Sequence, residues 1–440
     1  MTTPSTTTSS TQHARIAVVG AGYVGVTTAV CLAHHGHAVV CGDNDLAKVE
    51  KLSAGIPTFV EEGLGALLNQ GLSSRRLHFV TSAAASVRDA EFVFICVSTP
   101  GRPDGSPDLS ALEAVASEIA PHLSPGAVVV NKSTVPIGST VLVERLLGRD
   151  DVTVVSNPEF LREGSAIHDC LFPARIVVGG KDRTVAARVG ELLGTDHAPL
   201  IVTDAATAEM IKYASNGFLA TKLSFANAVS DLCERVGADA HDVLRGMGYD
   251  PRIGSSFLHP GPGWGGSCLP KDTHALIFMA KQAGFPFPFL EEIIRSNEAH
   301  METVVTKIRQ ACEGVLAGSV IAAWGLTFKA GTDDLRQSPA LAVLELVAEE
   351  GARIKAFDPT TIGRSVHELP DLEIHHDAYS ACHGAKALTI LTEWPEFASV
   401  DLAKIAQVMA PSPTIIDTRS LLDPSEVRRA GINYVGVGRG

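Results

Sequence analysis

A glycine-rich turn near the start of the chain constrains the fold more than any other segment. Gly20-Ala-Gly22-Tyr23-Val24-Gly25 follows the β-branched run RIAVV directly and opens a helix of small residues. A strand, a tight glycine turn and a helix form the context in which G-x-G-x-x-G indicates a dinucleotide-binding βαβ unit. The glycines let the backbone approach a pyrophosphate, and the helix N-terminus offers N–H groups to it. The turn therefore predicts an α/β fold with parallel strands.

An acidic residue, Asp43, ends the next strand-like run, HAVVCGD. A carboxylate about 20 residues after the turn accepts hydrogen bonds from ribose hydroxyls and repels a 2′-phosphate, so the predicted cofactor is NAD rather than NADP. The alternative is a glycine turn in a Rossmann-like domain that binds another ligand. The residues predicted here to bind NAD are Gly20, Gly22, Tyr23, Val24, Gly25 and Asp43.

Strand-like runs alternate with helical stretches up to about residue 200 and again after about residue 318. This predicts two Rossmann-like, doubly wound parallel-sheet domains. The proline-free stretch 204–236 between them predicts a long central helix that opens a helical connector domain. We expect a disordered tail at 1–13, an NAD-binding domain at 14–203, a central helical and dimerisation domain at 204–315, and a second Rossmann-like domain at 316–440. The second domain repeats the plan of the first, with Asp358 in the place of Asp43.

Charge and composition exclude several classes of partner. The formal net charge of -13 disfavours nucleic acid and anionic lipid as partners, and no Lys/Arg-rich block makes a local exception. No apolar run reaches the ~20 residues that a membrane helix needs. The eight cysteines include no C-x-x-C pair, so we expect no metal site and a reducing, cytoplasmic location. The Thr/Ser-rich start does not resemble a signal peptide.

One cysteine differs from the rest. Cys268 lies in PRIGSSFLHPGPGWGGSCLPKD, residues 251–272, where glycines and prolines favour a displayed loop. Lys271 and Asp272 follow it and bring charge close to the thiol. We expect Cys31, Cys41, Cys96, Cys233, Cys312 and Cys382 to be buried hydrophobic residues, and leave Cys170 open.

Ordered motifs run through almost the whole chain. After GAGYVG they are CVSTP (96–100), KSTVP (132–136), NPEFLREGSAIHD (157–169), IKYASNGFLATK (211–222), GGSCLPKD (265–272), GLTFKAGTDDLRQSP (325–339), LTEWPEF (391–397) and DTRS (417–420). Together these motifs resemble those of the UDP-glucose/GDP-mannose dehydrogenase family. Trp264 departs from the family's usual Tyr or Phe, and Ala174 replaces a common acid. Neither departure removes a reacting group.

The resemblance implies oxidation of a nucleotide sugar's primary alcohol to a carboxylate, with two NAD consumed per turnover. The cysteine matching Cys268 carries a thiohemiacetal and then a thioester. UDP-glucose is the favoured substrate, giving UDP-glucuronate, and the alternatives are GDP-mannose and a UDP-N-acetylhexosamine. A remote alternative is a non-catalytic, NAD-responsive scaffold. Retention of Cys268, Lys212 and Asn216 argues against the scaffold.

The family's reacting groups match further residues of this chain. Lys212 and Asn216 match the pair that stabilises the oxyanion. Glu163 and Asp272 match the two carboxylates that work with water, and their division between acid and base stays open. Thr134 matches a threonine that holds this water.

Binding roles carry over in the same way. The resemblance assigns further cofactor contacts to Lys48, Thr99, Thr134, Glu163, Lys271 and Arg336. It assigns UDP-sugar binding to the domain at 316–440 and to Glu159, Phe160, Leu161, Glu163, Lys212, Asn216, Arg252, Phe257, Leu258, Gly261, Gly265, Cys268, Lys329 and Arg419. The arginine matching Arg252 reaches a neighbouring subunit's site, so a homodimer or higher homo-oligomer is expected.

Overall fold

The computed structural model describes residues 13–194, 198–363, 366, 369 and 372–439, and they form two compact units. The first unit contains the residues up to Arg102 together with Pro107–Lys212. The second contains Pro103–Ser106 and the chain from Tyr213 onward. The predicted tail at 1–13 lies outside the described residues except for His13. The predicted domain boundaries stay a prediction.

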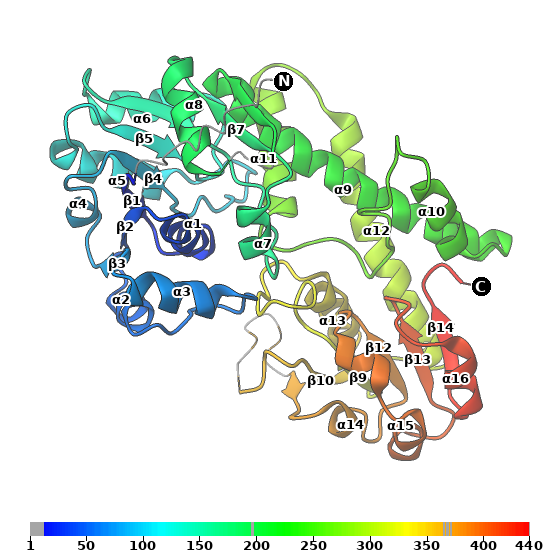
Figure 1. The fold of residues 1–440 in the computed structure, drawn as a ribbon. Coiled ribbons are helices and arrows are strands. Elements are labelled where there is room, and N and C mark those ends of the chain that lie inside the picture. The colour runs from blue at the N-terminus through cyan, green and yellow to red at the C-terminus, as the bar shows by residue number, and fades with distance from the viewer. Residues whose placement is uncertain (1–12, 195–197, 364–365, 367–368, 370–371, 440) are drawn as a thin grey trace, which may run out of the picture. The chain divides into compact units, whose positions relative to one another are not determined.

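The first unit is built on an eight-stranded sheet with the order β3-β2-β1-β4-β5-β6-β7-β8 (Figure 1). Its strands are β1 (Arg15–Val19), β2 (Ala38–Gly42), β3 (Leu77–Val80), β4 (Phe92–Ile95), β5 (Val128–Asn131), β6 (Thr153–Ser156), β7 (Ile176–Gly179) and β8 (Leu200–Thr203). The pairs from β3 to β6 are parallel, as predicted. β7 pairs with β6 in the antiparallel sense, and β8 is parallel to β7. The edge at β7 and β8 thus differs from a wholly parallel sheet.

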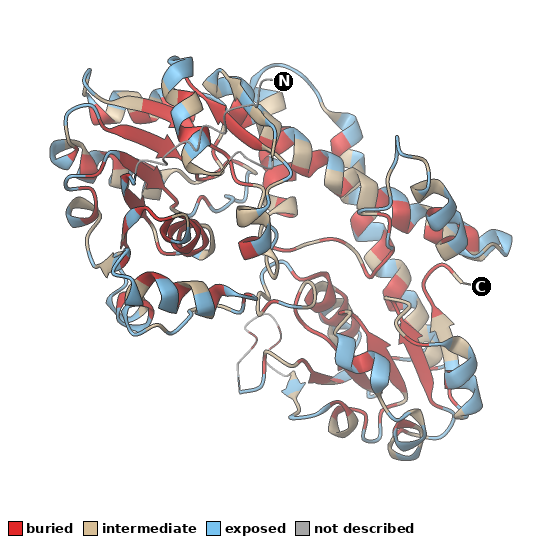
Figure 2. Cartoon of the chain, in the orientation of Figure 1, coloured by how far each residue is buried: buried red, intermediate tan, exposed pale blue. Residues whose placement is uncertain are grey.

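Side chains alternate across this sheet, as a doubly wound fold requires. In β1, Ile16 and Val18 join one buried cluster, while Ala17 and Val19 join the other. The first cluster is covered by α1 (Tyr23–His34), α2 (Leu46–Ser53), α3 (Leu64–Ser73), α7 (Ala166–Leu171) and α8 (Arg183–Leu192). The second is covered by α5 (Ser110–Ile119) and α6 (Ser139–Leu147), with the short α4 (Ala83–Ser86) and η1 (Ala120–His122) nearby. Figure 2 shows the resulting buried strands in red.

Between β8 and the first strand of the second sheet, the chain forms four helices. They are α9 (Ala205–Val236), α10 (Ala240–Gly248), α11 (Leu269–Gln282) and α12 (Pro288–Ala311). The predicted long helix is thus present and continuous from the first unit into the second. Small residues of α9 pack here, since Ala226 joins a buried cluster with Leu244 of α10 and Leu258.

The second unit holds a parallel six-stranded sheet with the order β11-β10-β9-β12-β13-β14. Its strands are β9 (Val320–Trp324), β10 (Arg353–Phe357), β11 (Glu373–Ile374), β12 (Ala387–Ile390), β13 (Thr414–Asp417) and β14 (Asn433–Gly436). α12 and α13 (Pro339–Glu349) cover one cluster; α14 (Ala378–Ala381), η3 (Pro395–Ser399), α15 (Leu402–Val408) and α16 (Pro424–Arg429) cover the other. The predicted fold class is confirmed.

The two sheets share the winding order 3-2-1-4-5-6 in their first six strands, which supports the predicted internal repeat. Their acidic residues differ in what they bind. Asp358 accepts hydrogen bonds from Leu326 N at 2.9 Å and from Trp394 Nε1 at 3.1 Å, and it is fully buried. The second sheet thus uses its acid to hold its own loops.

Candidate active site

The glycine turn has the geometry that the sequence predicts. Gly20 has a φ of 100°, and its N–H donates to the Gly42 carbonyl at 2.8 Å. A Cβ on Gly25 would lie 1.8 Å from the Gly20 carbonyl oxygen, so the helix start and the turn pack without space for a side chain. Gly22 is the N-cap of α1, and a Cβ there would meet nothing within 4 Å. The turn can therefore present bare backbone to a pyrophosphate.

Asp43 lies beside this turn and is bound on both oxygens. Its Oδ2 accepts from Ala21 N at 2.7 Å and from Lys48 Nζ at 3.0 Å, and its Oδ1 accepts from Asp45 N. Partial burial alone would raise the pKa of Asp43, but the N–H groups of Asp45 and Ala21 and the Lys48 ammonium hold it below its usual range. The structure thus brings together two predicted NAD residues, Asp43 and Lys48, as a charged pair beside the turn.

A buried carboxylate that the sequence analysis missed, Glu61, joins the glycine turn to the NPEFLREG segment. Its Oε2 accepts from the Tyr23 hydroxyl and, at 2.7 Å, from Gly164 N. The pKa of Tyr23 is raised by burial and by the hydrogen bond to Glu61. The charge of half-buried Glu163 adds to this shift. Val24, next to Tyr23, packs against the first core cluster. Glu61 therefore ties a predicted cofactor residue to the loop that carries Glu163.

Lys212 and Glu159 form a buried ion pair in the first unit. The distance from Lys212 Nζ to Glu159 Oε1 is 2.7 Å, and their side chains are 4% and 7% exposed. Burial pushes the pKa of Glu159 up, but Lys212 and the Leu161 N–H, which donates to Oε2 at 2.7 Å, lower it below its usual range. The Phe160 ring lies under the Arg175 guanidinium at 3.5 Å. A buried cation held by a charged carboxylate is a suitable group to face a developing oxyanion.

Thr134 lies in the segment between β5 and α6, close to Lys212. Its carbonyl accepts from the buried Thr99 hydroxyl at 2.6 Å. A small pocket is lined by Ser133, Thr134, Val135, Ser156, Pro158, Glu209 and Lys212. The structure thus brings three of the predicted site residues, Thr134, Thr99 and Lys212, close together.

Glu209 is a second carboxylate that the sequence analysis missed. Its Oε2 accepts from Gly138 N at 2.7 Å, and its Oε1 accepts from Thr140 N at 2.9 Å and from the Thr140 hydroxyl at 2.7 Å. Burial raises the pKa of Glu209, although these hydrogen bonds oppose the shift. Its position three residues before Lys212 is the signal that could have identified it, because residues i and i+3 of a helix are neighbours.

Cys268 is the N-cap residue of α11. It is half-buried, whereas the six cysteines predicted to be buried are all buried; Cys170 is also half-buried. The Ser267 hydroxyl lies 3.7 Å from Cys268 Sγ. N–H groups and the dipole at a helix N-terminus favour negative charge. The thiol therefore stands where a thiolate or an oxyanion is stabilised.

Asp272, one turn into α11, links two other predicted residues. Its Oδ2 accepts from Asn216 Nδ2 at 2.6 Å, and its Oδ1 accepts from Lys271 Nζ at 2.6 Å. The Asp272 side chain is 1% exposed, and its N–H donates to the Cys268 carbonyl. Four predicted residues of the second unit thus form one connected group around the first turn of α11.

Arg419 and Gly261 come together in the second unit. A Cβ on Gly261 would lie 2.7 Å from Arg419 Nη1, so the Arg419 guanidinium would have to shift to admit a side chain there. Arg419 Nε also lies 3.0 Å from Glu393 Oε2, which places the LTEWPEF segment against it. Gly265 lies so close to the Gln337 carbonyl that a Cβ would be 2.0 Å from it. The Cys268 segment therefore packs on the loop that carries Lys329 and Arg336.

Other predicted substrate residues have different surroundings. Arg252 is 87% exposed and pairs with its neighbour Asp250, at 2.6 Å. Phe257 is half-buried with a φ of 61°. The Leu258 side chain is buried in a hydrophobic cluster, so a ligand contact from Leu258 would come from its backbone. Lys329 is half-buried, and the exposed Arg336 binds Asp334 Oδ2 at 2.7 Å.

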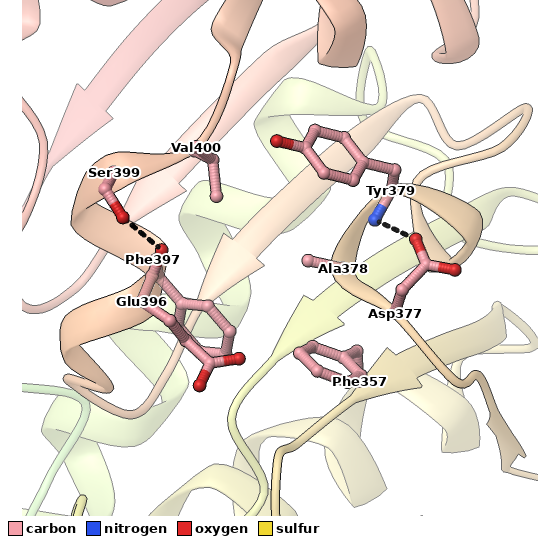
Figure 3. A pocket seen from close by; sticks show the side chains of 8 residues that line it. All are labelled: Phe357, Asp377, Ala378, Tyr379, Glu396, Phe397, Ser399 and Val400. Carbon is pink, nitrogen blue, oxygen red and sulfur yellow. Dashed lines mark hydrogen bonds between the residues drawn. The ribbon is translucent and has the colours of Figure 1, made fainter.

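A further cavity lies at the carboxyl ends of β10, β11 and β12. Its volume is about 240 Å³, and it is lined by Phe357, Asp377, Ala378, Tyr379, Glu396, Phe397, Ser399 and Val400. Figure 3 shows Tyr379 and Asp377 on one side and Glu396, Ser399 and Val400 on the other. None of these is a predicted site residue.

Within the described part of the chain, no group of three or more His, Cys, Asp or Glu residues could hold a metal ion. Among the helices formed by the described residues, none is both long and apolar enough to cross a membrane.

Three family models match successive parts of the chain. They are the NAD binding domain of the UDP-glucose/GDP-mannose dehydrogenase family at residues 14–195, its central domain at 206–299 and its UDP binding domain at 322–424. The chain is 44% identical to a UDP-glucose 6-dehydrogenase of Rhizobium meliloti (strain 1021), over 97% of this chain and 99% of that protein.

Solved structures are similar over the same length. A UDP-glucose dehydrogenase from Pyrobaculum islandicum has a TM-score of 0.90 and 36% identity, covering 98% of this chain and 99% of the other. A UDP-D-ManNAc dehydrogenase from Pyrococcus horikoshii has a TM-score of 0.86 and 30% identity, covering 97% and 99%. Both neighbours oxidise nucleotide sugars according to their names, but they differ in the sugar.

Proposed function

Since this chain belongs to the UDP-glucose/GDP-mannose dehydrogenase family, we propose that it oxidises UDP-glucose to UDP-glucuronate through Cys268, with two NAD consumed per turnover. The alternative substrates for the same chemistry are GDP-mannose and a UDP-N-acetylhexosamine. The observation that carries the proposal is the group around α11: a half-buried thiol at the helix N-terminus, with Asp272 buried one turn away and bound by Asn216 and Lys271.

The residues of the first unit fit NAD. The bare backbone at Gly22 and the close packing of Gly25 on Gly20 leave a cradle that a side chain would fill. The Asp43 carboxylate lies beside it, next to Lys48. These residues would hold the cofactor, which when bound supplies the acceptor for a hydride from C6 of the sugar.

The first half-reaction converts the C6 alcohol to an aldehyde. The carbon loses a hydride, and the hydroxyl loses a proton to a water-linked carboxylate, for which Glu163 and Asp272 are the candidates. The Cys268 thiol gives up its proton, its sulfur forms a bond to the aldehyde carbon, and the aldehyde oxygen becomes an oxyanion that takes up a proton to give the thiohemiacetal. Lys212 and Asn216 are proposed to donate to this oxyanion, and the salt bridge to Glu159 orients the Lys212 ammonium.

The second half-reaction needs the covalent bond to sulfur. The thiohemiacetal loses a second hydride and a proton, and the product is a thioester on Cys268. Water adds to the thioester carbon, the carbon–sulfur bond breaks, and the carboxylate leaves while the thiol regains a proton. Thr134 is proposed to hold this water. Four electrons leave the sugar, in agreement with two NAD per turnover.

The choice of sugar rests on the relatives. A relative at 44% identity and the neighbour from Pyrobaculum islandicum are both named for UDP-glucose, whereas the neighbour at 30% identity is named for UDP-D-ManNAc. The test is NADH formation by the purified protein with UDP-glucose, GDP-mannose, UDP-GlcNAc and UDP-ManNAc, each with NAD. We expect two NADH per UDP-glucose and UDP-glucuronate as the product. Absence of turnover with UDP-glucose would overturn the choice of sugar.

We also propose that the chain forms a homodimer or higher homo-oligomer through α9. Phe218, Phe225 and Leu232 are seven residues apart and 64%, 52% and 58% exposed, so they give one side of the helix an apolar stripe. The exposed Arg252 is proposed to reach a neighbouring subunit's site. Cytoplasmic location is proposed from the free cysteines, because disulfides form in oxidising compartments.

A further inference from the structure

The segment between α10 and α11, which ends at Cys268, is attached at two points to side chains of α9 and α12. One point is Gly261 and the other is Trp264. The attaching side chains are Ser224, Asn227, Asn297 and His300, each 7% exposed or less, and none is among the predicted site residues. A loop normally keeps conformational freedom. The segment before Cys268 is instead held in place by buried polar side chains.

At Gly261, both backbone polar groups are bound by side chains. The Gly261 N–H donates to Asn227 Oδ1 at 3.0 Å, and the Gly261 carbonyl lies 2.7 Å from His300 Nε2. A carbonyl only accepts, so Nε2 carries the proton. The other ring nitrogen, Nδ1, lies 2.9 Å from Asp231 Oδ2, which fixes the plane of the imidazole. We call Asn227 and His300 the upstream anchor.

At Trp264, one amide side chain binds both backbone groups. Trp264 N donates to Asn297 Oδ1 at 2.9 Å, and Asn297 Nδ2 donates to the Trp264 carbonyl at 3.0 Å. The indole Nε1 donates to Ser224 Oγ at 2.7 Å, and Ser224 donates to the Ile293 carbonyl at 3.1 Å. We call Asn297 and Ser224 the downstream anchor. The indole contact depends on Trp264, because among the aromatic side chains only Trp carries this N–H donor on an indole ring.

The two anchors hold different parts of the site. Gly261 lies against the Arg419 guanidinium, which is proposed to bind the UDP. Trp264 is followed by Gly265 and Gly266, which pack against the Gln337 carbonyl and lead to Cys268. Displacement at Gly261 therefore moves a ligand contact, whereas displacement at Trp264 moves the thiol. Reacting groups lose rate when misplaced by about 1 Å.

We propose that the two anchors are positioning residues with separate tasks: Asn227 and His300 set the affinity for the UDP-sugar, and Asn297 and Ser224 set the position of the Cys268 thiol. This division rests on the proposed function. It makes a split between KM and kcat the expected consequence of breaking one anchor or the other.

The upstream test replaces His300 by Leu, which removes the donor to Gly261. Without this donor Gly261 can shift relative to Arg419, so we expect KM for UDP-glucose and the Kd for UDP alone, measured by calorimetry, to rise about tenfold. kcat should stay within about twofold. His300→Gln keeps an N–H donor and should recover most of the affinity. Unchanged UDP binding in His300→Leu would overturn the upstream task.

The downstream test replaces Asn297 by Leu, which is similar in size but cannot bind the Trp264 backbone. We expect kcat to fall about 10- to 100-fold with KM and UDP binding nearly unchanged. The rate at which iodoacetamide alkylates Cys268, followed by peptide mass spectrometry, should also change. That rate needs no turnover, so it reports the thiol position directly. If Asn297→Leu is alkylated at Cys268 at the same rate as the unaltered protein, the task proposed for the downstream anchor is wrong.

Matched controls separate these outcomes from general damage. Glu302→Gln changes an exposed residue of the same helix and should leave every measurement unaltered. The midpoint of urea unfolding is measured for each variant to show that it is folded. If Asn297→Leu does not fold, Asn297→Asp replaces it in the test, because Asp keeps the acceptor for the Trp264 N–H. If the unaltered protein oxidises none of the nucleotide sugars, the proposed function fails. If it is active and both variants change KM and kcat alike, only the division between the anchors fails.

Discussion

Asn216 and Asp272 are joined by a hydrogen bond of 2.6 Å between Nδ2 and Oδ2, and both side chains are buried. The bond links α9 to the first turn of α11, directly after Cys268. Both Asp272 oxygens accept, one from the Asn216 amide and the other from the Lys271 ammonium, with which Asp272 forms an ion pair. Its charge therefore determines how the proposed oxyanion donor and the thiol segment are held.

Replacement of Asp272 by Asn tests that requirement. The new amide turns an N–H group toward either the Asn216 amide or the Lys271 ammonium, so one donor loses its acceptor. An unpaired buried polar group costs about 1–3 kcal/mol. We expect a lower midpoint of thermal unfolding and a kcat reduced at least tenfold. An Asn variant with unaltered stability and kcat would contradict the role of the charge. Glu292→Gln, an exposed substitution on α12, is the control.

Replacement of Cys268 by Ser tests the nucleophile. Ser is a far weaker nucleophile at neutral pH, so UDP-glucuronate formation should fall by about 10³-fold or more. NAD affinity, measured by calorimetry, should be nearly unaltered, and one hydride transfer can remain. Cys170→Ser alters the other half-buried cysteine and should not affect acid formation. Undiminished acid formation by Cys268→Ser would refute the covalent route.

Two alanine substitutions in the glycine turn should separate folding from cofactor binding. A Cβ at Gly25 would lie 1.8 Å from the Gly20 carbonyl, so Gly25→Ala should lower stability and abolish NAD binding. A Cβ at Gly22 meets nothing within 4 Å, and its φ of -77° suits any residue. Gly22→Ala should therefore keep its unfolding midpoint but bind NAD at least tenfold more weakly. Equal NAD affinity in Gly22→Ala and the unaltered protein would show that the cofactor does not approach there.

The Lys212–Glu159 pair should make stability depend on pH in acid. The pKa of Glu159 is lowered in the folded protein, so the unfolded chain binds its proton more readily. The stabilisation is fully present above the unfolded value of about 4.3 and is lost as pH falls through the folded pKa. Glu159→Gln should flatten this part of the curve of unfolding free energy against pH. Lys212→Met should destabilise by about 3–5 kcal/mol, because a buried carboxylate loses its partner. If the unfolding free energy of Glu159→Gln depends on pH in acid as steeply as that of the unaltered protein, Glu159 is not the source of this dependence.

Replacement of Phe225 by Asp should test the oligomer. A charge in the middle of the apolar stripe opposes burial of α9 against another copy. We expect light scattering after size exclusion to give a smaller mass for Phe225→Asp than for the unaltered protein. Glu302→Gln is a charge-changing control on α12. A mass that does not change with Phe225→Asp would exclude this side of α9 from the interface.

Sequence patterns predicted the elements that local rules govern. The G-x-G-x-x-G turn, the long proline-free helix and the exceptional cysteine were all identified, because backbone conformation and helical periodicity depend on neighbouring residues. The antiparallel pairing of β7 with β6 was not expected, since strand direction depends on how the chain returns across the sheet. The surroundings of Leu258 were also not visible in its glycine- and proline-rich segment.

The sequence by itself determined the fold class and the family, and it predicted which side chains carry the chemistry. Only the tertiary structure decided which buried groups hold them. Glu61 and Gly164 are separated by 103 residues, and Glu209 and Gly138 by 71, yet each pair shares a hydrogen bond. His300 reaches Gly261 across 39 residues. No periodicity relates residues so far apart, because their contact arises when helices and strands pack and buried polar groups must find partners.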